Sequence, residues 1–477
     1  MHPRAAPGDR LRVWLGAFDR SSPPDLEWRL GGQSARIEPV RPLAPAHSFR
    51  AASHTGVFDV LGTASEPVVP GRRYDLSVRA VGSGESPTSL SVRSLPSAVT
   101  PGSPFNVLLC SCFHLDQDRT GRVGSTVSGL PLAHRPDLTL LVGDQVYLDL
   151  PTLQNFSTRE SWLASKFERD YRANWGGNGD RGFAQVLRAA PSVSTPDDHE
   201  YWNNFPHRSP FVGNTWTESG RQSWRTAAEA LLDAYQGSSP VGRGDPVEID
   251  VSPLAFLVLD GRSERQADRS RSMSPGTLKR LPGWVDECLE EGRTGVVVTG
   301  QSLLDPPSGG LSGAAGDRAL ANYGDYAPVV QELARLADAG RPVVLLTGDR
   351  HWSRVASYRG GDGRLRFVEI ISSPASLVTT VGRDPLRRLG AAIGSLFGRR
   401  DPWPRHSDPR DPPDYLARKV LGKRIRLDWV QGHRGDQVAT LSFRPRAGRV
   451  ELSVRFWPVR SGRPRPVAAR TIRLGPA

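Results

Sequence analysis

The sequence predicts a mixed α/β protein with a small β-sandwich at its N-terminal end. Strand-like and helix-like patterns alternate from residue 105 onward, which is typical of an α/β core. Residues 1–100 instead carry strand-length apolar segments separated by Gly and Pro, with no helical period. The chain has 477 residues, more than one ordinary hydrophobic core supports, so a second domain is expected.

The N-terminal region contains four segments of strand length, at residues 11–16, 58–61, 74–78 and 89–93. They predict an immunoglobulin-like or fibronectin-like β-sandwich domain over residues 1–100. Residues 96–104 are rich in Pro, Ser, Gly and Thr, and we interpret them as a linker. The second domain is therefore expected to span residues 101–477.

From residue 105 onward the sequence predicts both strands and helices. Strands are predicted at residues 105–110, 138–142, 255–259, 295–299, 343–347 and 367–371, and helices at 221–235, 279–290 and 326–339. Four further strands are predicted at 424–429, 438–443, 450–456 and 468–474, where they extend or cover the central sheets. Residues 375–416 interrupt the pattern and are interpreted as a lid-like insertion. Apolar residues at helical spacing within it allow a membrane-surface helix as an alternative, although a helix packed on its own domain is favoured.

The composition is basic, with a formal net charge of +12. Lysine occurs only at Lys166, Lys279, Lys419 and Lys423, so nearly all of the positive charge is arginine. Arginine binds phosphate groups through a planar fork of donors, which favours a polyanionic substrate. The alternative is a compositional bias that places arginine on solvated faces, and the spread of arginine along the whole chain favours that alternative.

Other features of the sequence bound the location and the partners. No segment approaches the roughly 20 apolar residues that span a bilayer, so no integral membrane segment is expected. Residues 1–12 lack the apolar core of an export signal, and we expect a cytoplasmic location. The three cysteines are too few for a disulfide scaffold. No pattern indicates an obligate protein partner.

Four polar clusters stand at or close behind apolar segments, at residues 111–114, 143–147, 197–200 and 348–351. In α/β sheets, ligands bind at the carboxyl ends of the strands. Carboxylates, imidazoles, a phenol and a thiol together suit hard cations and at least one transition metal. Each cluster alone also has an ordinary structural interpretation, but their joint order favours one metal-binding cleft.

Asp144 directly follows the strand at 138–142, and Tyr147 comes three residues later, so both oxygens can reach one cation. The alternative is a Gly-Asp turn followed by a packed tyrosine. Asp349 and His351 follow the strand at 343–347, and two side chains at this spacing point the same way in an extended chain. The alternative for this pair is a surface histidine after a turn.

Cys112 and His114 share the same spacing after the strand at 105–110. A thiolate ligand favours a transition metal, and the alternative is a buried free cysteine. Asp198 and His199 follow Thr195-Pro196, which is also a good helix start with Thr195 as the N-cap. That interpretation uses the acidic residues but gives no role to His199.

Two more residues close predicted strands at the same end of the sheet. Arg262 follows the strand at 255–259 and can clamp a phosphate oxygen, although an ordinary salt bridge explains it equally well. Gln301 follows the strand at 295–299 and is either a neutral ligand or a turn residue.

These motifs resemble those of the calcineurin-like metallophosphoesterases and, within them, the alkaline phosphatase D (PhoD-like) family. The shared motifs are Ser111-Cys112, Gly143-Asp144-Gln145-Val146-Tyr147, Asp197-Asp198-His199-Glu200, Leu259-Asp260-Gly261-Arg262, Gly300-Gln301 and Gly348-Asp349-Arg350-His351. The likeness covers roughly residues 1–375. It implies a four-layer α/β/β/α sandwich behind the N-terminal β-sandwich, and hydrolysis of phosphomonoesters, phosphodiesters or both.

The resemblance also implies roles for single residues. Ferric iron would be bound by Cys112, Asp144, Tyr147, Asp349 and His351. Asp144 would bridge to calcium or another divalent ion, such as Mn, Mg or Zn, which Asp198 would help to bind. His199 would face the phosphate. His114 departs from the usual PhoD-like pattern, so it is an extra ligand, a substrate contact or a bystander.

The mechanism expected from these residues is attack on phosphorus by a hydroxide held between two cations. His199 would then donate a proton to the leaving alkoxide or stabilise its charge, and Arg262 would neutralise charge on the transferring group. Arg262, Gln301 and His114 are the candidate substrate-binding residues. The expected partner is a phosphoester, which the basic composition allows to be polyanionic.

The competing functional class is a non-catalytic basic protein that binds nucleic acid or another polyanion. Aromatic side chains that could stack on bases gather in one stretch of sequence, at Tyr201, Trp202, Phe205, Phe211, Trp216 and Trp224. The alternative, in which these side chains pack beside the metal site, is favoured.

Overall fold

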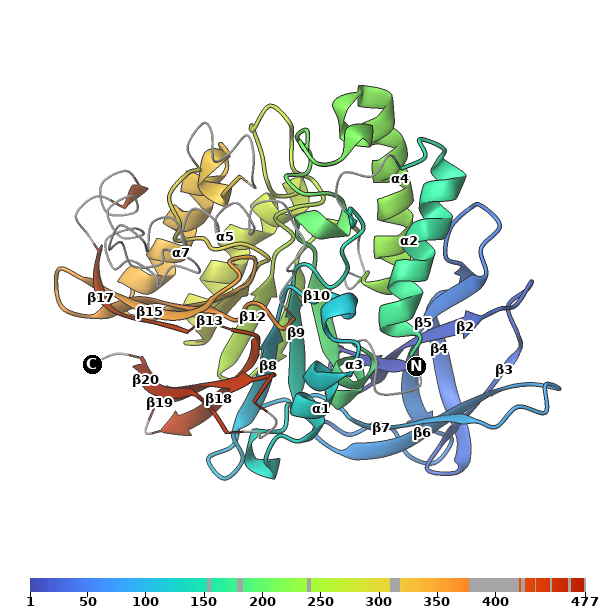
Figure 1. Cartoon of the computed structure of the whole chain (residues 1–477). Helices are drawn as coiled ribbons and strands as arrows, with labels where there is room; N and C mark the ends of the chain where they lie inside the picture. Colours follow the sequence, from blue (N-terminus) through green and yellow to red (C-terminus); the bar gives the residue numbers. More distant parts are fainter. Residues whose placement is uncertain are drawn as a thin grey trace.

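The computed structural model describes residues 1–151, 156–177, 183–237, 242–308, 318–376, 420–421, 425–433, 435–446, 448–461 and 465–475. Its fold is mixed α/β with two sheets, which confirms the predicted class at that level. Figure 1 shows the helices α5 and α7 on one side of the sheets and α2 and α4 on the other. The predicted insertion at 375–416 lies outside the described residues, apart from Ala375 and Ser376.

The larger sheet joins strands from both ends of the chain. In spatial order it contains β20 (Ala468–Leu474), β19 (Arg449–Pro458), β18 (Gln437–Arg446), β8 (Phe105–Cys110), β9 (Leu138–Val142), β10 (Ser192–Thr195), β1 (His2–Arg4), β2 (Leu11–Phe18), β5 (Ser53–Thr63), β4 (Gln33–Pro45), β3 (Leu26–Leu30), β6 (Arg73–Ala80) and β7 (Thr88–Arg93). Strands β8, β9 and β10 run parallel to one another.

The smaller sheet is built mostly from the second half of the α/β region. In spatial order it contains β11 (Val247–Val251), β12 (Leu254–Val258), β13 (Thr294–Val298), β14 (Val343–Thr347), β16 (Leu365–Ile371), β15 (Ser353–Gly360) and β17 (Ile425–His433). Strands β12, β13, β14 and β16 are parallel. All five residues of β9, β12, β13 and β14 are buried, as expected for parallel strands covered on both faces.

The helices cover the outer faces of the two sheets. They are α1 (Arg122–Ser128), α2 (Glu160–Trp175), α3 (Ala184–Ala189), α4 (Glu218–Tyr235), α5 (Pro275–Glu290) and α7 (Tyr326–Asp338), with short 3-10 helices η1 (Leu115–Gln117), η2 (Leu132–His134), η3 (Asp198–Glu200), η4 (Gly213–Trp216) and η5 (Leu320–Asn322). Ser274 caps α5 by accepting the backbone N–H of Thr277, and Pro275 stands at the first helical position. This is the start signal that Ser and Pro provide in sequence.

Side chains alternate between the faces of each central strand. Leu108 of β8 belongs to the apolar cluster that includes α2 and α4 residues, whereas its neighbour Leu109 belongs to a cluster between the two sheets. Phe256 of β12 contributes to the same inter-sheet cluster, and Leu257 contributes to the cluster under α5 and α7. The two sheets therefore share one core and each has helices on its other face.

The N-terminal strands are continuous with the central sheet. β1 pairs in parallel with β10 and antiparallel with β2, and β2 continues to β5. The four segments expected at 11–16, 58–61, 74–78 and 89–93 lie in β2, β5, β6 and β7. The domain division at residue 100 stays a prediction.

The C-terminal strands extend both sheets. β17 adds to the smaller sheet beside β15, while β18 pairs with β8 and is followed by β19 and β20. Within the described residues, none of the helices is both long and apolar enough to cross a membrane.

Candidate metal centre

The candidate site forms where the carboxyl ends of strands from both sheets meet. Gly348, after β14, lies so close to the larger sheet that a Cβ atom there would stand 2.2 Å from the carbonyl oxygen of Val142. Gly143, after β9, has φ +87°, and a Cβ there would stand 2.5 Å from the Cβ of Asp197. Glycine is required at both positions because the strand ends could not otherwise approach.

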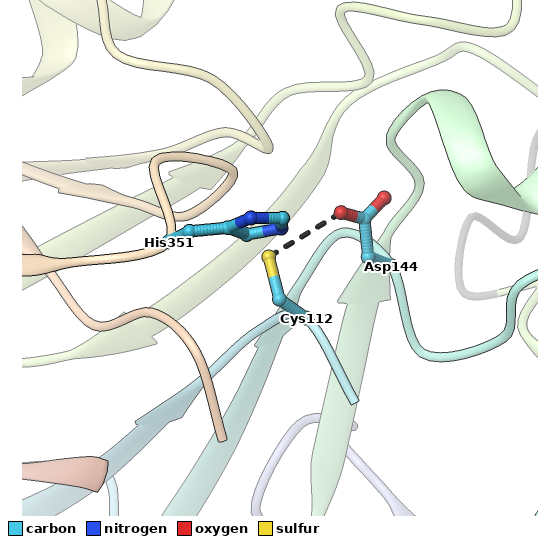
Figure 2. Close-up of side chains that lie close together, drawn as sticks. All are labelled: Cys112, Asp144 and His351. Atoms are coloured by element: carbon cyan, nitrogen blue, oxygen red, sulfur yellow. Dashed lines mark hydrogen bonds between the residues drawn. The ribbon is translucent and has the colours of Figure 1, made fainter. Parts of the chain in front are cut away.

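Asp144 is common to three groups of side chains that can hold a cation. The first group joins it to Cys112 and His351, with one donor atom of each residue within 4.8 Å of the others. The Cys112 Sγ lies 3.3 Å from Asp144 Oδ2. Figure 2 shows the thiol, the carboxylate and the imidazole of His351 converging from three separate segments.

The other two groups also include Asp144. One contains Asp198 and His199, and the other contains Asp197, Asp198 and Asp349, again with donor atoms within 4.8 Å. The sequence prediction required Cys112 and Asp349 to meet Asp144, and the structure places them together. It also adds Asp197, which the sequence analysis did not assign as a ligand.

The backbone at these positions is unusual. Cys112, Asp144, Asp349 and His351 have φ values of 53°, 59°, 63° and 52°. Non-glycine residues adopt this left-handed region at a cost, and such residues cluster at functional sites. The expectation that Asp349 and His351 point the same way because the chain is extended is therefore wrong: both lie in the loop between β14 and β15, with left-handed backbone.

Burial and neighbouring negative charges disfavour the ionised forms of the acidic groups at the site. Burial, and after it the negative charge of Asp144, raise the pKa of the Cys112 thiol well above its ordinary value. Burial also raises the pKa of Asp144 well above its ordinary value, with Asp198, Glu200 and Asp349 adding to the effect and His199 opposing it. Bound cations would reverse both effects, since they stabilise thiolate and carboxylate.

Among the described residues, neither the buried hydroxyl oxygen of Tyr147 nor the buried Oδ2 of Asp197 makes a hydrogen bond. Burial and then the charges of Cys112 and Asp144 raise the pKa of Tyr147 well above its ordinary value. Buried polar atoms normally have partners. These unpaired oxygens, together with the crowded acids, fit a site that binds metal ions.

His199 is held beside the acids by a second carboxylate that the sequence analysis missed. Its Nδ1 lies 2.8 Å from Asp149 Oδ1, and Asp149 also accepts the backbone N–H of Asn203 at 2.9 Å. Burial lowers the pKa of His199, but the negative charges of Asp149, Asp198 and Asp144 outweigh it and raise the pKa well above its ordinary value. The ring of Tyr147 is 4.3 Å away.

Glu200 orients the loops without joining the ligand groups. Its buried carboxylate accepts backbone N–H groups from Asp144 at 2.9 Å, Gln145 at 2.6 Å and Asp197 at 2.9 Å. The predicted N-cap at Thr195 is wrong. Thr195 ends β10, and the cap of η3 is Asp197, which forms a reciprocal capping box with Glu200. The Asp-x-x-Glu spacing was the available signal for this arrangement.

The three candidate substrate-binding residues lie in different surroundings. Arg262 is fully buried, donates from Nε to Asp197 Oδ1 at 2.9 Å and from Nη1 to the carbonyl of Phe205 at 3.1 Å, and so forms the salt bridge that was its alternative. Gln301 donates to Asp349 Oδ2 at 3.2 Å. His114 has 14% of its side chain exposed and lies 5.6 Å from the Tyr147 ring.

The aromatic residues between 201 and 224 mostly pack inside the protein. Tyr201, Trp202, Phe205 and Trp224 belong to the core cluster on the helical side of the larger sheet, and only Trp216 is strongly exposed, at 57%. Buried rings cannot stack on bases, so this stretch does not favour the nucleic-acid alternative.

Residues 107–283 match the family model of the PhoD-like phosphatases, so the resemblance seen in the motifs is confirmed. The solved structure of PhoD aligns with 99% of this chain and 92% of its own, with a TM-score of 0.58 and 12% identity, which shows a shared fold.

A structure of GAP50, the anchor in the inner membrane complex of Plasmodium, aligns with 79% of this chain and 90% of its own. Its TM-score is 0.35 and its identity is 9%, a likeness from which we infer nothing. No curated protein matches the chain.

Proposed function

We propose that this chain, which is similar to the PhoD-like phosphatases, is a metal-dependent hydrolase of phosphomonoesters, phosphodiesters or both. The observation that carries the proposal is the position of Asp144, whose carboxylate belongs to all three candidate ligand groups. A carboxylate shared in this way is what two neighbouring cations need in order to act on one phosphoryl group.

We assign the ligands in two sets. Cys112, Asp144, Tyr147, Asp349 and His351 suit ferric iron, because a thiolate and a phenolate are ligands for a transition metal. Asp144 and Asp198 suit calcium or another divalent ion, to which Asp197 offers the unpaired Oδ2. When bound, the two cations would supply an activated water and neutralise charge on the phosphoryl group.

The protein's own contribution centres on His199. Because Nδ1 is bound to Asp149, Nε2 is the atom that we assign to the leaving-group oxygen, where it donates a proton or stabilises the developing charge. Asp149 fixes the orientation of the ring, and Glu200 fixes the loops that carry Asp144 and Asp197. We do not assign Arg262 to the substrate, since it is buried against Asp197.

The finer description of the fold belongs to the same proposal. The apolar clusters on both faces of each sheet support a four-layer α/β/β/α sandwich as the catalytic domain. The expected N-terminal β-sandwich would be the part in which apolar residues of β2 and β5 pack with those of β3, β6 and β7, although β2 is also joined through β1 to β10 of the central sheet.

The test is hydrolysis of p-nitrophenyl phosphate and bis-p-nitrophenyl phosphate by the purified chain and by a His199→Ala variant. We expect the variant to keep its metal content and to lose about 10²–10⁴ in kcat, the usual contribution of a positioned acid. An Asn variant at His134, a histidine in η2, controls for loss of an imidazole elsewhere. Activity that survives His199→Ala unchanged would contradict the assignment, and absence of any hydrolysis by metal-loaded wild type would contradict the function.

A further inference from the structure

A cavity lies between the larger sheet, β11 and β12, and the C-terminal end of α4. Its volume is about 350 Å³, within the range of small-molecule pockets. Arg4 of β1 and Arg41 of β4 line it, together with Thr195 and Gln236. None of the proposed metal ligands lines this cavity.

Arg4 and Arg41 first serve α4, which ends at Tyr235. Arg4 Nη2 donates to the carbonyl of Tyr235, and Arg41 donates from Nη1 and Nη2 to the carbonyls of Asp233 and Ala234. The last carbonyls of a helix lack partners within it and carry a partial negative charge of about half an electron. This role accounts for some of the guanidinium nitrogens, but not for all of them.

The remaining nitrogens have no partner among the described residues. Nε and Nη1 of Arg4 and Nε of Arg41 are buried and make no hydrogen bond, and Arg4 is only 4% exposed. Neither arginine forms a salt bridge among the described residues. The other two arginines that line the cavity do, since Arg12 pairs with Asp59 and Arg243 pairs with Asp233. A buried cation without an acidic partner is costly.

The acids of the cavity wall are already engaged. Asp233, whose charge reaches Arg41, is bound by Arg243 at 2.9 and 3.1 Å. Arg12 is bound to Asp59 through two nitrogens, at 2.8 and 2.9 Å.

The other two lining acids face different groups. Asp245 accepts from Ser274 at 3.1 Å, and Asp260 accepts the backbone N–H groups of Arg262 and Ser263, each at 2.9 Å. Within the described residues, the hydrogen bonds of buried Arg4 and partly buried Arg41 therefore go only to neutral carbonyls, although the charge of Asp233 reaches Arg41. Burial, and after it the positive charge of Arg41, lower the pKa of Arg4 to about 9.

We propose that this cavity binds the phosphate group of a small anion, held by Arg4 and Arg41. An anion there would neutralise the two guanidinium groups and provide acceptors for their unpaired nitrogens. The same chemistry serves inorganic phosphate and a phosphate monoester, and the volume admits either. The site does not depend on the proposed hydrolysis, because its residues are not those of the metal centre.

Residues that line the cavity are connected to the metal centre through the chain and through a hydrogen bond. Thr195 and Pro196 line the cavity and directly precede Asp197. Gln236 donates to Glu200 Oε1 at 3.2 Å, and Glu200 holds the backbone of Asp144. An anion bound here would therefore contact the support of the ligand loops.

The test is calorimetric titration of the full chain with inorganic phosphate and, separately, with AMP. We use wild type and an Asp144→Asn variant, so that binding at the metal centre is removed in the second. We expect phosphate or AMP to bind the Asp144→Asn protein and to raise its Tm. Tighter binding of AMP identifies a phosphate monoester as the occupant, and tighter binding of phosphate identifies the free anion.

Adding Arg41→Met to the Asp144→Asn protein should weaken this binding about tenfold or more, since a charge-assisted hydrogen bond is lost. Arg41→Lys should keep part of the affinity, and Arg359→Met, at a distant exposed pair, should change nothing. Unchanged affinity in Arg41→Met, or loss of all binding in Asp144→Asn alone, overturns the proposal. Should Arg41→Met not fold, selenate soaked into wild-type crystals decides: an anion peak between Arg4 and Arg41 supports the site, and its absence overturns it.

Discussion

Two clusters of buried charged residues, one around Asp144 and one around Arg354, differ in how their carboxylates are neutralised. Around Asp144, four carboxylates and a thiol converge, and Arg262 pairs with one of these carboxylates, that of Asp197. Around Arg354, the charges are balanced: its guanidinium bonds both Asp305 and Glu369, and Arg350 adds a second pair to Asp305 at 2.8 Å. Burial alone does not separate the two clusters, because most residues in both are buried.

The pKa directions express the difference. Burial tends to raise the pKa of Asp305, but the charges of Arg350 and Arg354 outweigh it and lower the pKa. Burial and neighbouring acids together raise the pKa of Asp144. Glu369, the deeper acid of the balanced cluster, has a raised pKa because burial exceeds the effect of Arg354. This difference fits a structural role for the cluster around Arg354 and the proposed binding of cations by the cluster around Asp144.

The largest difference between the two clusters is expected when one carboxylate is neutralised in each. We expect Asp144→Asn to reduce bound metal and hydrolysis to background, because one residue serves every ligand group. We expect its metal-free Tm to stay equal or rise, since repulsion is relieved. Asp305→Asn should do the reverse, keeping metal and losing Tm. Elemental analysis and thermal unfolding measure both, and a metal-free Asp144→Asn that unfolds well below wild type contradicts the account.

The next largest effect is expected at Arg354. Arg354→Met leaves two buried acids without their shared partner, so the free energy of unfolding should fall by about 3–5 kcal/mol. Arg359→Met is the matched control on the same strand, where a partly exposed pair with Asp428 is worth only about 0–1 kcal/mol. Urea unfolding of the metal-free proteins compares them. Equal losses at the two positions would show that the inner cluster is not balanced as described.

A smaller effect is expected at Asp149. Asp149→Asn should lower kcat about 10–100-fold, as when an outer partner of a functional group is removed, with metal content unchanged. Combined with His199→Ala, it should cause no further loss, because both act through one imidazole. Steady-state kinetics of the single and double variants tests this, and an additive loss would mean that Asp149 acts by another route.

The smallest effect concerns one oxygen. Tyr147→Phe removes a buried hydroxyl that makes no hydrogen bond to any of the described residues. Its metal-free stability should therefore rise by about 1 kcal/mol. In the iron-loaded protein, the same change should remove the phenolate contribution to visible absorption. A metal-free variant less stable than wild type would indicate that the hydroxyl already has a partner.

Sequence patterns predicted the central strands well. β8, β9 and β14 have the bounds expected of them, because parallel strands buried on both faces are continuous apolar segments. The helix α2 was missed because its buried face includes Lys166 and Glu168, which hide the apolar period. β4 was missed because it is largely exposed and contains prolines, and β10 because Ser192–Thr195 has no apolar run.

The sequence predicted those candidate ligands that directly follow the end of a strand. That rule brought Cys112, Asp144 and Asp349 to one place, although the extended geometry assumed for Asp349 was wrong. Asp149 lies outside any strand-end motif, so only the three-dimensional structure connects it to His199. Arg4 and Arg41 come from β1 and β4 and are joined through the end of α4, which no local pattern indicates.

The central claim is that the unbalanced acids around Asp144 hold a pair of cations. Elemental analysis of wild type, Asp144→Asn and Asp305→Asn, all purified without metal-affinity resins and reloaded with iron and calcium, tests it directly. The account predicts about two metal ions per chain in wild type and in Asp305→Asn, and almost none in Asp144→Asn. Equal metal content in wild type and Asp144→Asn, or a folded wild type that takes up no metal, would contradict it.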